Sequence, residues 1–297
     1  MPEKVTTLTT PASQPSLPAE LDFQTDTVTI PVKLCNLPPL NSIANQVLAL
    51  SADPDIDLRR LAFVMEADPA FAAEILLLAN SSLFGFTSRM SVLRHAIAIL
   101  GLDRIKALAV TVSMRAFLGH GGPLVQHCWR HSAACAVISE EISPIFDFSG
   151  DQAYTAALMH DIGRLGLLKS YAREMTPVLE GEYTDLAAEL VAEREALQID
   201  HGVAGAWLVK NWAYPQSFAD VCEHHHDPIS PKDPALLRLV KVACRMADAL
   251  GYSAVRYQRV VSYSDLLAQL PRPDTFPTEE ELRKNVKARL AVFELAP

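Results

Sequence analysis

The chain has 297 residues, of which 49% are hydrophobic and 21% charged, and its formal net charge is −9 at pH 7. This composition provides for a large buried core and argues against global disorder. Because no block of Lys or Arg offsets the negative charge, the sequence gives little electrostatic basis for nucleic-acid binding. The linear cues for such binding, Arg59-Arg60 and Arg104 with Lys106, fit solvated helix faces better.

Five cysteines, an odd number, occur without any Cys-x-x-Cys pair: Cys35, Cys128, Cys135, Cys222 and Cys244. This usage argues against a disulfide framework or a zinc ribbon and predicts mostly buried, small apolar side chains. The N-terminus has no basic region followed by an apolar one, and no apolar run approaches the ~20 residues that span a bilayer. We therefore expect a cytoplasmic protein that makes no membrane contact.

Residues 1–28 are rich in Thr, Pro, Ser and Gln, which predicts a flexible tail. From 37 to 118 the apolar residues recur with helical spacing. Asp57 is expected to cap a helix over 58–67. Asp68-Pro69 predicts the start of the next helix, because Asp accepts a hydrogen bond from a free N–H and Pro lacks one. That helix is expected to end at Asn80-Ser81-Ser82, with Gly85 in the following turn.

A cluster of Gly and Pro over 119–123, around His120, predicts an internal boundary. Beyond it, Asp233-Pro234 repeats the start signal seen at Asp68-Pro69, and a terminal helix is expected from Thr278. Helical periodicity covers the segments 124–142, 151–168, 186–197, 201–212, 217–225 and 235–250.

The only strand-like pattern is a weak one over 28–31, so the predicted fold class is all-α. We expect two helical lobes. The first lobe covers 29–122 and the second 123–260, and a C-terminal extension with its terminal helix covers 261–297.

His160-Asp161, in the run Ala156 to Arg164, places a nitrogen and an oxygen ligand side by side after an apolar helical stretch. These ligand types suit zinc, iron or manganese, ions that activate water and can clamp the oxygens of a phosphoester. Each such residue alone is more often a hydrogen-bonded His or a paired Asp than a ligand. Their joint order is what predicts a metal site, with the other candidates at His131, His201, His225, His226 and Asp248.

In this order, His131, His160, Asp161 and Asp248 resemble the ligands of the HD superfamily of metal-dependent phosphohydrolases. The later residues resemble the extra ligands of the HD-GYP branch, which hydrolyses cyclic di-GMP: His201 with Gly205, then His225-His226. The Gly-Tyr-Pro signature of that branch is absent, and Arg164 stands where its lysine is expected. Arg keeps the charge with a different donor geometry. In a hydrolase it would contact phosphate.

The first lobe is similar to the HDOD domain, the HD-related output domain. The resemblance extends over 32–250 and rests on separated motifs: Leu37-Pro-Pro-Leu, Asp68-Pro69, 78–85, 96–101, Trp129-Arg-His-Ser and Trp207 to Trp212. It implies an all-α module of bacterial signalling proteins, regulatory and protein-binding, without established hydrolase activity.

Two functions stay open. The first is a regulatory signalling module that acts mainly through protein–protein interaction. The alternative is a metal-dependent phosphohydrolase or phosphodiesterase acting on a nucleotide. In the alternative, one ion is held by His131, His160, Asp161 and Asp248, and a second by His201, His225 and His226. Whether the protein is an enzyme is left open, and the non-enzymatic function is favoured. A third possibility combines the two functions: a regulatory module whose bound metal has only a structural or sensory role.

Overall fold

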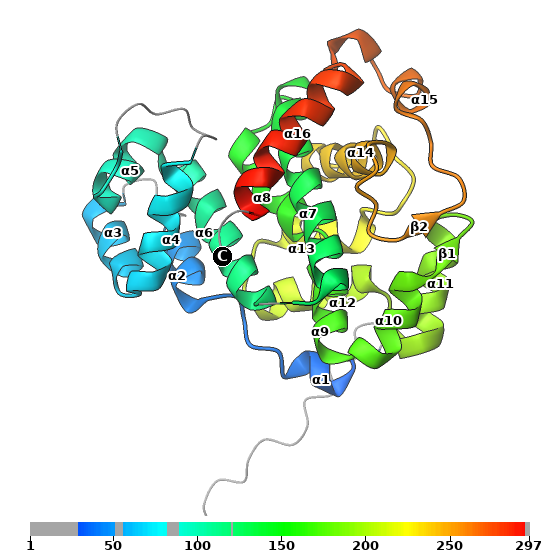
Figure 1. The fold of residues 1–297 in the computed structure, drawn as a ribbon, viewed down its shortest axis with the longest axis horizontal. Coiled ribbons are helices and arrows are strands. Elements are labelled where there is room, and N and C mark those ends of the chain that lie inside the picture. The colour runs from blue at the N-terminus through cyan, green and yellow to red at the C-terminus, as the bar shows by residue number, and fades with distance from the viewer. Residues whose placement is uncertain (1–28, 51–55, 82–88, 120, 295–297) are drawn as a thin grey trace, which may run out of the picture.

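The computed structural model describes residues 29–50, 56–81, 89–119 and 121–294 (Figure 1). The tail predicted over 1–28 lies outside the described residues, as do Ser82 to Gly85 of the HDOD-like motif over 78–85 and His120 at the predicted boundary.

The prediction of an all-α fold with two helical lobes is confirmed (Figure 1). The first lobe contains α2 (Ser42–Leu50), α3 (Leu58–Glu66), α4 (Pro69–Ala79), α5 (Leu93–Leu100) and α6 (Leu102–Leu118). The second lobe contains α7 (Pro123–Ile142), η1 (Ser143–Phe146), α8 (Gly150–Met159), α9 (Ile162–Ser170), α10 (Ala172–Glu180), α11 (Leu186–Leu197), α12 (His201–Asn211), α13 (Gln216–His224) and α14 (Ala235–Ala249). After it come α15 (Tyr263–Ala268), η2 (Pro273–Thr275) and α16 (Glu279–Glu294).

Among the described residues, strand structure is confined to β1 (Glu182–Tyr183) and β2 (Arg256–Tyr257), which pair in parallel. The strand-like pattern over 28–31 forms no strand in its described part, 29–31. This β pair lies beside α11 and close to the site described below. Through it, the chain just before the C-terminal extension packs against the second lobe.

Two of the three predicted helix caps are confirmed. Asp57 accepts a hydrogen bond from the backbone N–H of Arg59 at 2.9 Å, and Asp68 accepts from Ala70 and Phe71 at 3.0 and 3.1 Å. The third was wrong: α14 begins after Pro234 without a side-chain cap. Asp233 instead accepts from the Ser230 N–H and from Lys241 Nζ, both at 3.0 Å.

A short helix, α1 (Val32–Cys35), precedes the first lobe and lies against α9 of the second lobe (Figure 1). Its fully buried Leu34 reaches Gly166 on α9, where an added Cβ would lie 3.3 Å from the Leu34 methyl carbon. Residues 32–35 were predicted to belong to the first lobe. In the structure they pack against α9 of the second lobe.

Glu140 on α7 connects both lobes and the C-terminal helix. Its carboxylate accepts from Arg104 on α6 at 2.5 Å and from Arg289 on α16 at 2.6 Å. Arg104 also pairs with Asp151 on α8 at 2.9 Å, and Lys106 pairs with Asp103 at 2.8 Å. Arg104 and Lys106 are thus paired within the fold. Among the described residues, no helix combines the length and apolar character needed to span a membrane.

Candidate metal centre

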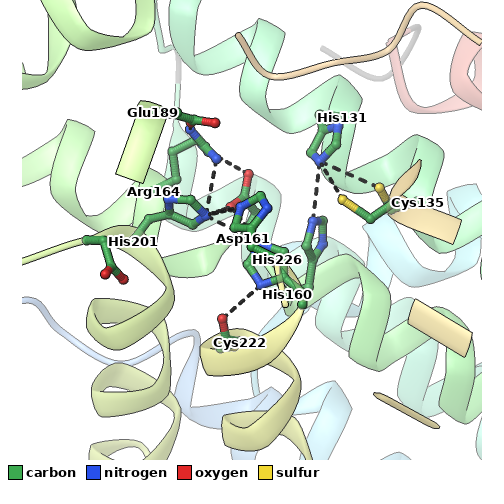
Figure 2. Close-up of polar contacts among 12 residues, drawn as sticks. His131, Cys135, His160, Asp161, Arg164, Glu189, His201, Cys222 and His226 are labelled. Carbon is green, nitrogen blue, oxygen red and sulfur yellow. Dashed lines mark hydrogen bonds and ion pairs between the residues drawn. The ribbon is translucent and has the colours of Figure 1, made fainter. Parts of the chain in front are cut away.

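His160 and Asp161 lie at the break between α8 and α9. Helix α8 ends at Met159 and α9 begins at Ile162, so both residues sit where the chain changes direction. Both side chains are fully buried. A buried imidazole and a buried carboxylate need partners, because an unpaired polar group away from water costs free energy. The rest of the site supplies those partners (Figure 2).

Close packing of α9 on α12 brings Asp161 and His201 together. A Cβ added at Gly163 would lie 1.9 Å from the carbonyl oxygen of His201 and 2.4 Å from the nitrogen of Gly205. Only glycine at position 163 permits this approach, and Gly205 opposite it lacks a side chain as well. The result places Asp161 Oδ1 3.3 Å from His201 Nε2.

Three histidines of the site are held at their Nδ1 atoms by backbone carbonyl oxygens, whereas His226 Nδ1 is buried without a hydrogen-bond partner. His131 Nδ1 lies 2.7 Å from the carbonyl oxygen of Tyr252, and His160 Nδ1 lies 2.6 Å from that of Ala157. His225 Nδ1 lies 2.8 Å from the carbonyl oxygen of Cys222. Carbonyl oxygens only accept, so Nδ1 carries the proton in each ring. Nε2 is then free for a cation, the arrangement that orients metal-bound histidines in proteins.

One group of ligand atoms consists of Asp161 Oδ1 and the Nε2 atoms of His201, His225 and His226. His201 Nε2 lies 2.7 Å from His226 Nε2 and 3.4 Å from His225 Nε2. His225 Nε2 lies 3.9 Å from Asp161 Oδ1, which is buried without a hydrogen-bond partner. Acceptor atoms this close repel one another unless a positive charge lies among them. The guanidinium of Arg164, 3.2 Å from His201 Nε2, already places one positive charge beside the group. Three imidazole nitrogens and one carboxylate oxygen are also a ligand set that a divalent cation accepts.

A second group forms around His131 Nε2. It lies 3.3 Å from His160 Nε2, and 3.7 Å from each of the sulfur atoms of Cys135 and Cys244. Figure 2 shows His131 pointing toward His160 and two sulfur atoms. Asp248 lies on the other side of the ring, with Oδ1 3.9 Å from His131 Nδ1. The structure thus brings His131 and His160 together, but it places Asp248 behind His131 and Cys135 and Cys244 in front.

Arg164 lies inside the site and is 1% exposed. Its guanidinium donates to Asp161 Oδ2 at 2.7 Å and to Glu189 Oε1, and it lies 3.4 Å from Glu193 Oε1. One more nitrogen lies 3.2 Å from His201 Nε2. The guanidinium is thus occupied by protein carboxylates, and its contact with phosphate stays a prediction.

The charges of the site shift several pKa values. Burial acts to raise the pKa of Asp161, but Arg164 and the histidines hold it well below its ordinary value. Burial and the neighbouring imidazoles hold the pKa of His225 and of His226 well below the ordinary value. The pKa of His201 is raised instead: burial and Arg164 oppose this, and Glu193 and Asp161 outweigh them. Asp161 is thus an anion, and His225 and His226 are neutral imidazoles, at neutral pH.

The thiols form an unequal pair. A hydrogen bond with Cys135 holds the pKa of Cys244 well below its ordinary value, against burial, whereas burial holds that of Cys135 well above it. Burial lowers the pKa of His131, but the hydrogen bond with Cys244 and nearby anions raise it to about 10.

Four residues of the site escaped sequence analysis. Cys135 follows His131 by one helical turn on α7, and Cys244 precedes Asp248 by one turn on α14, a spacing that places each pair on one helix face. Glu189 and Glu193 show the same spacing on α11, where both are fully buried. The sequence did hold a signal for the two cysteines, because each lies four residues from a predicted ligand on the same helix.

The HDOD domain family matches residues 37–228, most of the chain. The chain therefore belongs to the HDOD family, as its motifs indicated. An uncharacterized protein of Treponema pallidum is 21% identical over 227 residues, which is 73% of this chain and 44% of that protein. The chain thus spans less than half the length of this relative.

Solved structures share the fold. An HDOD domain protein of unknown function from Geobacter sulfurreducens has a TM-score of 0.69 at 23% identity, covering 87% of this chain and 91% of that one. A candidate phosphohydrolase from Shewanella amazonensis has a TM-score of 0.66 at 18% identity, covering 88% and 94%. A candidate signal transduction protein from Marinobacter aquaeolei has a TM-score of 0.65 at 20% identity, covering 87% and 60%. At these identities the likeness shows the fold alone.

Proposed function

We propose that this protein is a regulatory signalling module that holds a divalent metal in its second lobe and binds a protein partner through its first. The observation that carries the metal is the convergence of Asp161 Oδ1 with the Nε2 atoms of His201, His225 and His226. Iron, manganese and zinc all accept such a nitrogen and oxygen set. Bound there, the ion would supply a positive charge that ties α12 and α13 to the α8–α9 junction.

The closure of the site favours a structural or sensory metal over a catalytic one. His160, Asp161, His201 and His225 are fully buried, and His226 is half-buried. Hydrolysis needs a metal with an open position for water and a path for substrate. Without an opening of the lobe, a nucleotide could approach this centre only from the side of His226.

The protein-binding role is supported by apolar side chains on the outside of the first lobe. Phe63 on α3 is 75% exposed, Ile99 on α5 is 56% exposed and Leu77 on α4 is 50% exposed. These three helices pack on one another. Large exposed apolar groups of this kind are typical of surfaces that bind other proteins.

The partner surface is tested by Phe63→Ser and Leu77→Ser in the full chain, with signalling output and partner capture as readouts. We expect both variants to lose partner binding and to keep the metal content of the wild type. The control is Asp161→Ala, which should lose metal. If the surface variants signal like the wild type, the proposed binding surface is wrong.

The second candidate is a metal-dependent phosphohydrolase. It is favoured by the same metal ligands and by the names of two Shewanella amazonensis proteins of this fold, each a candidate phosphohydrolase. The test is turnover of a panel of nucleotide phosphodiesters and monoesters by metal-loaded protein. Turnover that Asp161→Ala abolishes would establish the enzyme and displace the regulatory proposal.

A further inference from the structure

Four ligand atoms, one of them His131 Nε2, have the chemistry of a second metal site. This site adjoins the group around Asp161, since His160 also lies within 4.8 Å of the ligand atoms of Asp161 and His225. His131 and Cys135 come from α7, His160 from the α8–α9 junction and Cys244 from α14. All four atoms lie within 4.8 Å of one another. The side chains are between 0% and 4% exposed.

Their spacing is that of a tetrahedral metal site. Zinc binds nitrogen at about 2.0–2.1 Å and sulfur at about 2.3 Å, so a regular tetrahedron separates two nitrogens by about 3.3 Å and a nitrogen from a sulfur by about 3.6 Å. The two Nε2 atoms here are 3.3 Å apart, and each sulfur lies 3.7 Å from His131 Nε2. These three separations, all taken from His131 Nε2, leave room for a small cation among the four atoms.

The orientation of both imidazoles agrees with this. Each Nδ1 faces a carbonyl oxygen, of Tyr252 for His131 and of Ala157 for His160, so each Nε2 is aimed inward. Asp248 lies 3.9 Å from His131 Nδ1, on the outer side of the ring. The Tyr252 carbonyl oxygen, 2.7 Å from Nδ1, is the group that orients the ring.

The charge also balances. Two thiolates and one divalent cation sum to zero, and a neutral site avoids most of the cost of burying charge. Two sulfur and two nitrogen ligands in a tetrahedron are diagnostic of zinc among the common divalent ions. With four protein ligands, no position is left for water, which is the property of a structural zinc site.

We propose that His131, Cys135, His160 and Cys244 bind one structural zinc ion that joins α7, α14 and the α8–α9 junction. The site does not depend on the proposed function, because it shares no ligand with the group of Asp161, His201, His225 and His226. It would make the second lobe a zinc-stabilised bundle whether or not the other group is filled.

The test begins with the full-length wild type, so it does not depend on a variant folding. Zinc is removed with a chelator under reducing conditions, Co²⁺ is added, and the absorption spectrum is recorded. We expect intense thiolate-to-cobalt charge-transfer bands in the near ultraviolet, together with the visible bands of tetrahedral cobalt. A Co²⁺ complex without charge-transfer bands has no thiolate ligand and would overturn the proposal.

Elemental analysis of variants then assigns the ligands. Cys135→Ala and Cys244→Ala should each lose one equivalent of zinc relative to the wild type. The matched control is Cys128→Ala, which removes a thiol that is 1% exposed on the same helix as Cys135. Equal zinc in all three variants and the wild type would overturn the proposal.

A fourth variant separates this site from the proposed function. His226→Ala removes a ligand of the Asp161 group only. If it lowers the metal content and the Cys135 and Cys244 variants do not, the zinc site is refuted and the proposed function stands. If only the cysteine variants lower it, the zinc site stands and the metal centre of the proposed function fails.

Discussion

His131 and His160 are 29 residues apart in the chain, yet their Nε2 atoms lie 3.3 Å apart in the core of the second lobe. Each ring is held from behind by a backbone carbonyl oxygen at its Nδ1 atom. Two acceptor nitrogens are thereby aimed at one point in a buried region. The Nε2 atoms of His201 and His225 approach to 3.4 Å in a similar way, although His201 Nδ1 contacts the Glu193 carboxylate in place of a backbone carbonyl. These two approaches are the physical basis for expecting metal in this HDOD protein.

Metal removal should destabilise the second lobe. A ligand that binds only the folded state contributes about 2.7 kcal/mol when its free concentration is 100 times Kd. We expect chelation to lower the melting temperature of the wild type and re-addition of zinc or manganese to restore it. His95→Ala, which alters an exposed histidine on α5, should respond like the wild type. A melting temperature insensitive to chelation would argue against bound metal.

Gly163→Ala should destabilise the protein strongly. The new Cβ would overlap the backbone of His201 and Gly205, so α9 and α12 would have to separate. We expect a loss of about 1–3 kcal/mol or more in the free energy of unfolding, measured by urea denaturation, together with lost metal binding. Gly122→Ala is the control, because an added Cβ there meets nothing within 4 Å. Equal stability of the two variants would contradict the close packing.

Arg164→Met should leave Asp161, Glu189 and Glu193 without their buried counter-charge. Breaking a buried ion pair by removing one partner costs about 3–5 kcal/mol. We expect that loss in urea denaturation, and partial recovery when Glu189→Gln and Glu193→Gln are added. If Arg164→Met instead unfolds like the wild type but loses nucleotide binding, the predicted phosphate contact is its role.

The sequence predicted the all-α fold class and the two lobes, because both follow from local periodicity. The types and order of its His and Asp residues predicted a metal site. The sequence could not predict which ligands share an ion. Which ligands share an ion depends on the direction in which each ring nitrogen points. Helix α14 places Cys244 beside Nε2 of His131 and Asp248 on the side of its Nδ1. The same limit explains Asp233-Pro234: the dipeptide matches Asp68-Pro69, but Asp233 accepts from Lys241 and caps nothing.

Stability should fall at acid pH through Glu140. Burial acts to raise its pKa, but Arg104 and Arg289 hold it below the ordinary value of 4.5. A depressed folded pKa contributes stability above the unfolded pKa of about 4.3, and this is lost as the pH falls through the folded value.

The variant Glu140→Gln removes this contribution. We expect it to lower the free energy of unfolding by about 1.5–3 kcal/mol at pH 7, with a difference from the wild type that shrinks below about pH 4. Glu141→Gln, an exposed neighbour on α7, should follow the wild type throughout. A Glu140→Gln difference that stays constant with pH would show that the carboxylate charge is not what stabilises the contact between the lobes.

The central claim, that the second lobe holds metal, is tested most directly by elemental analysis of the purified full-length protein. The control is the double variant His160→Ala, Asp161→Ala. We predict one to two equivalents of divalent metal in the wild type and a clear loss in the double variant. A wild type that binds no metal after reconstitution with iron, manganese and zinc would contradict the account.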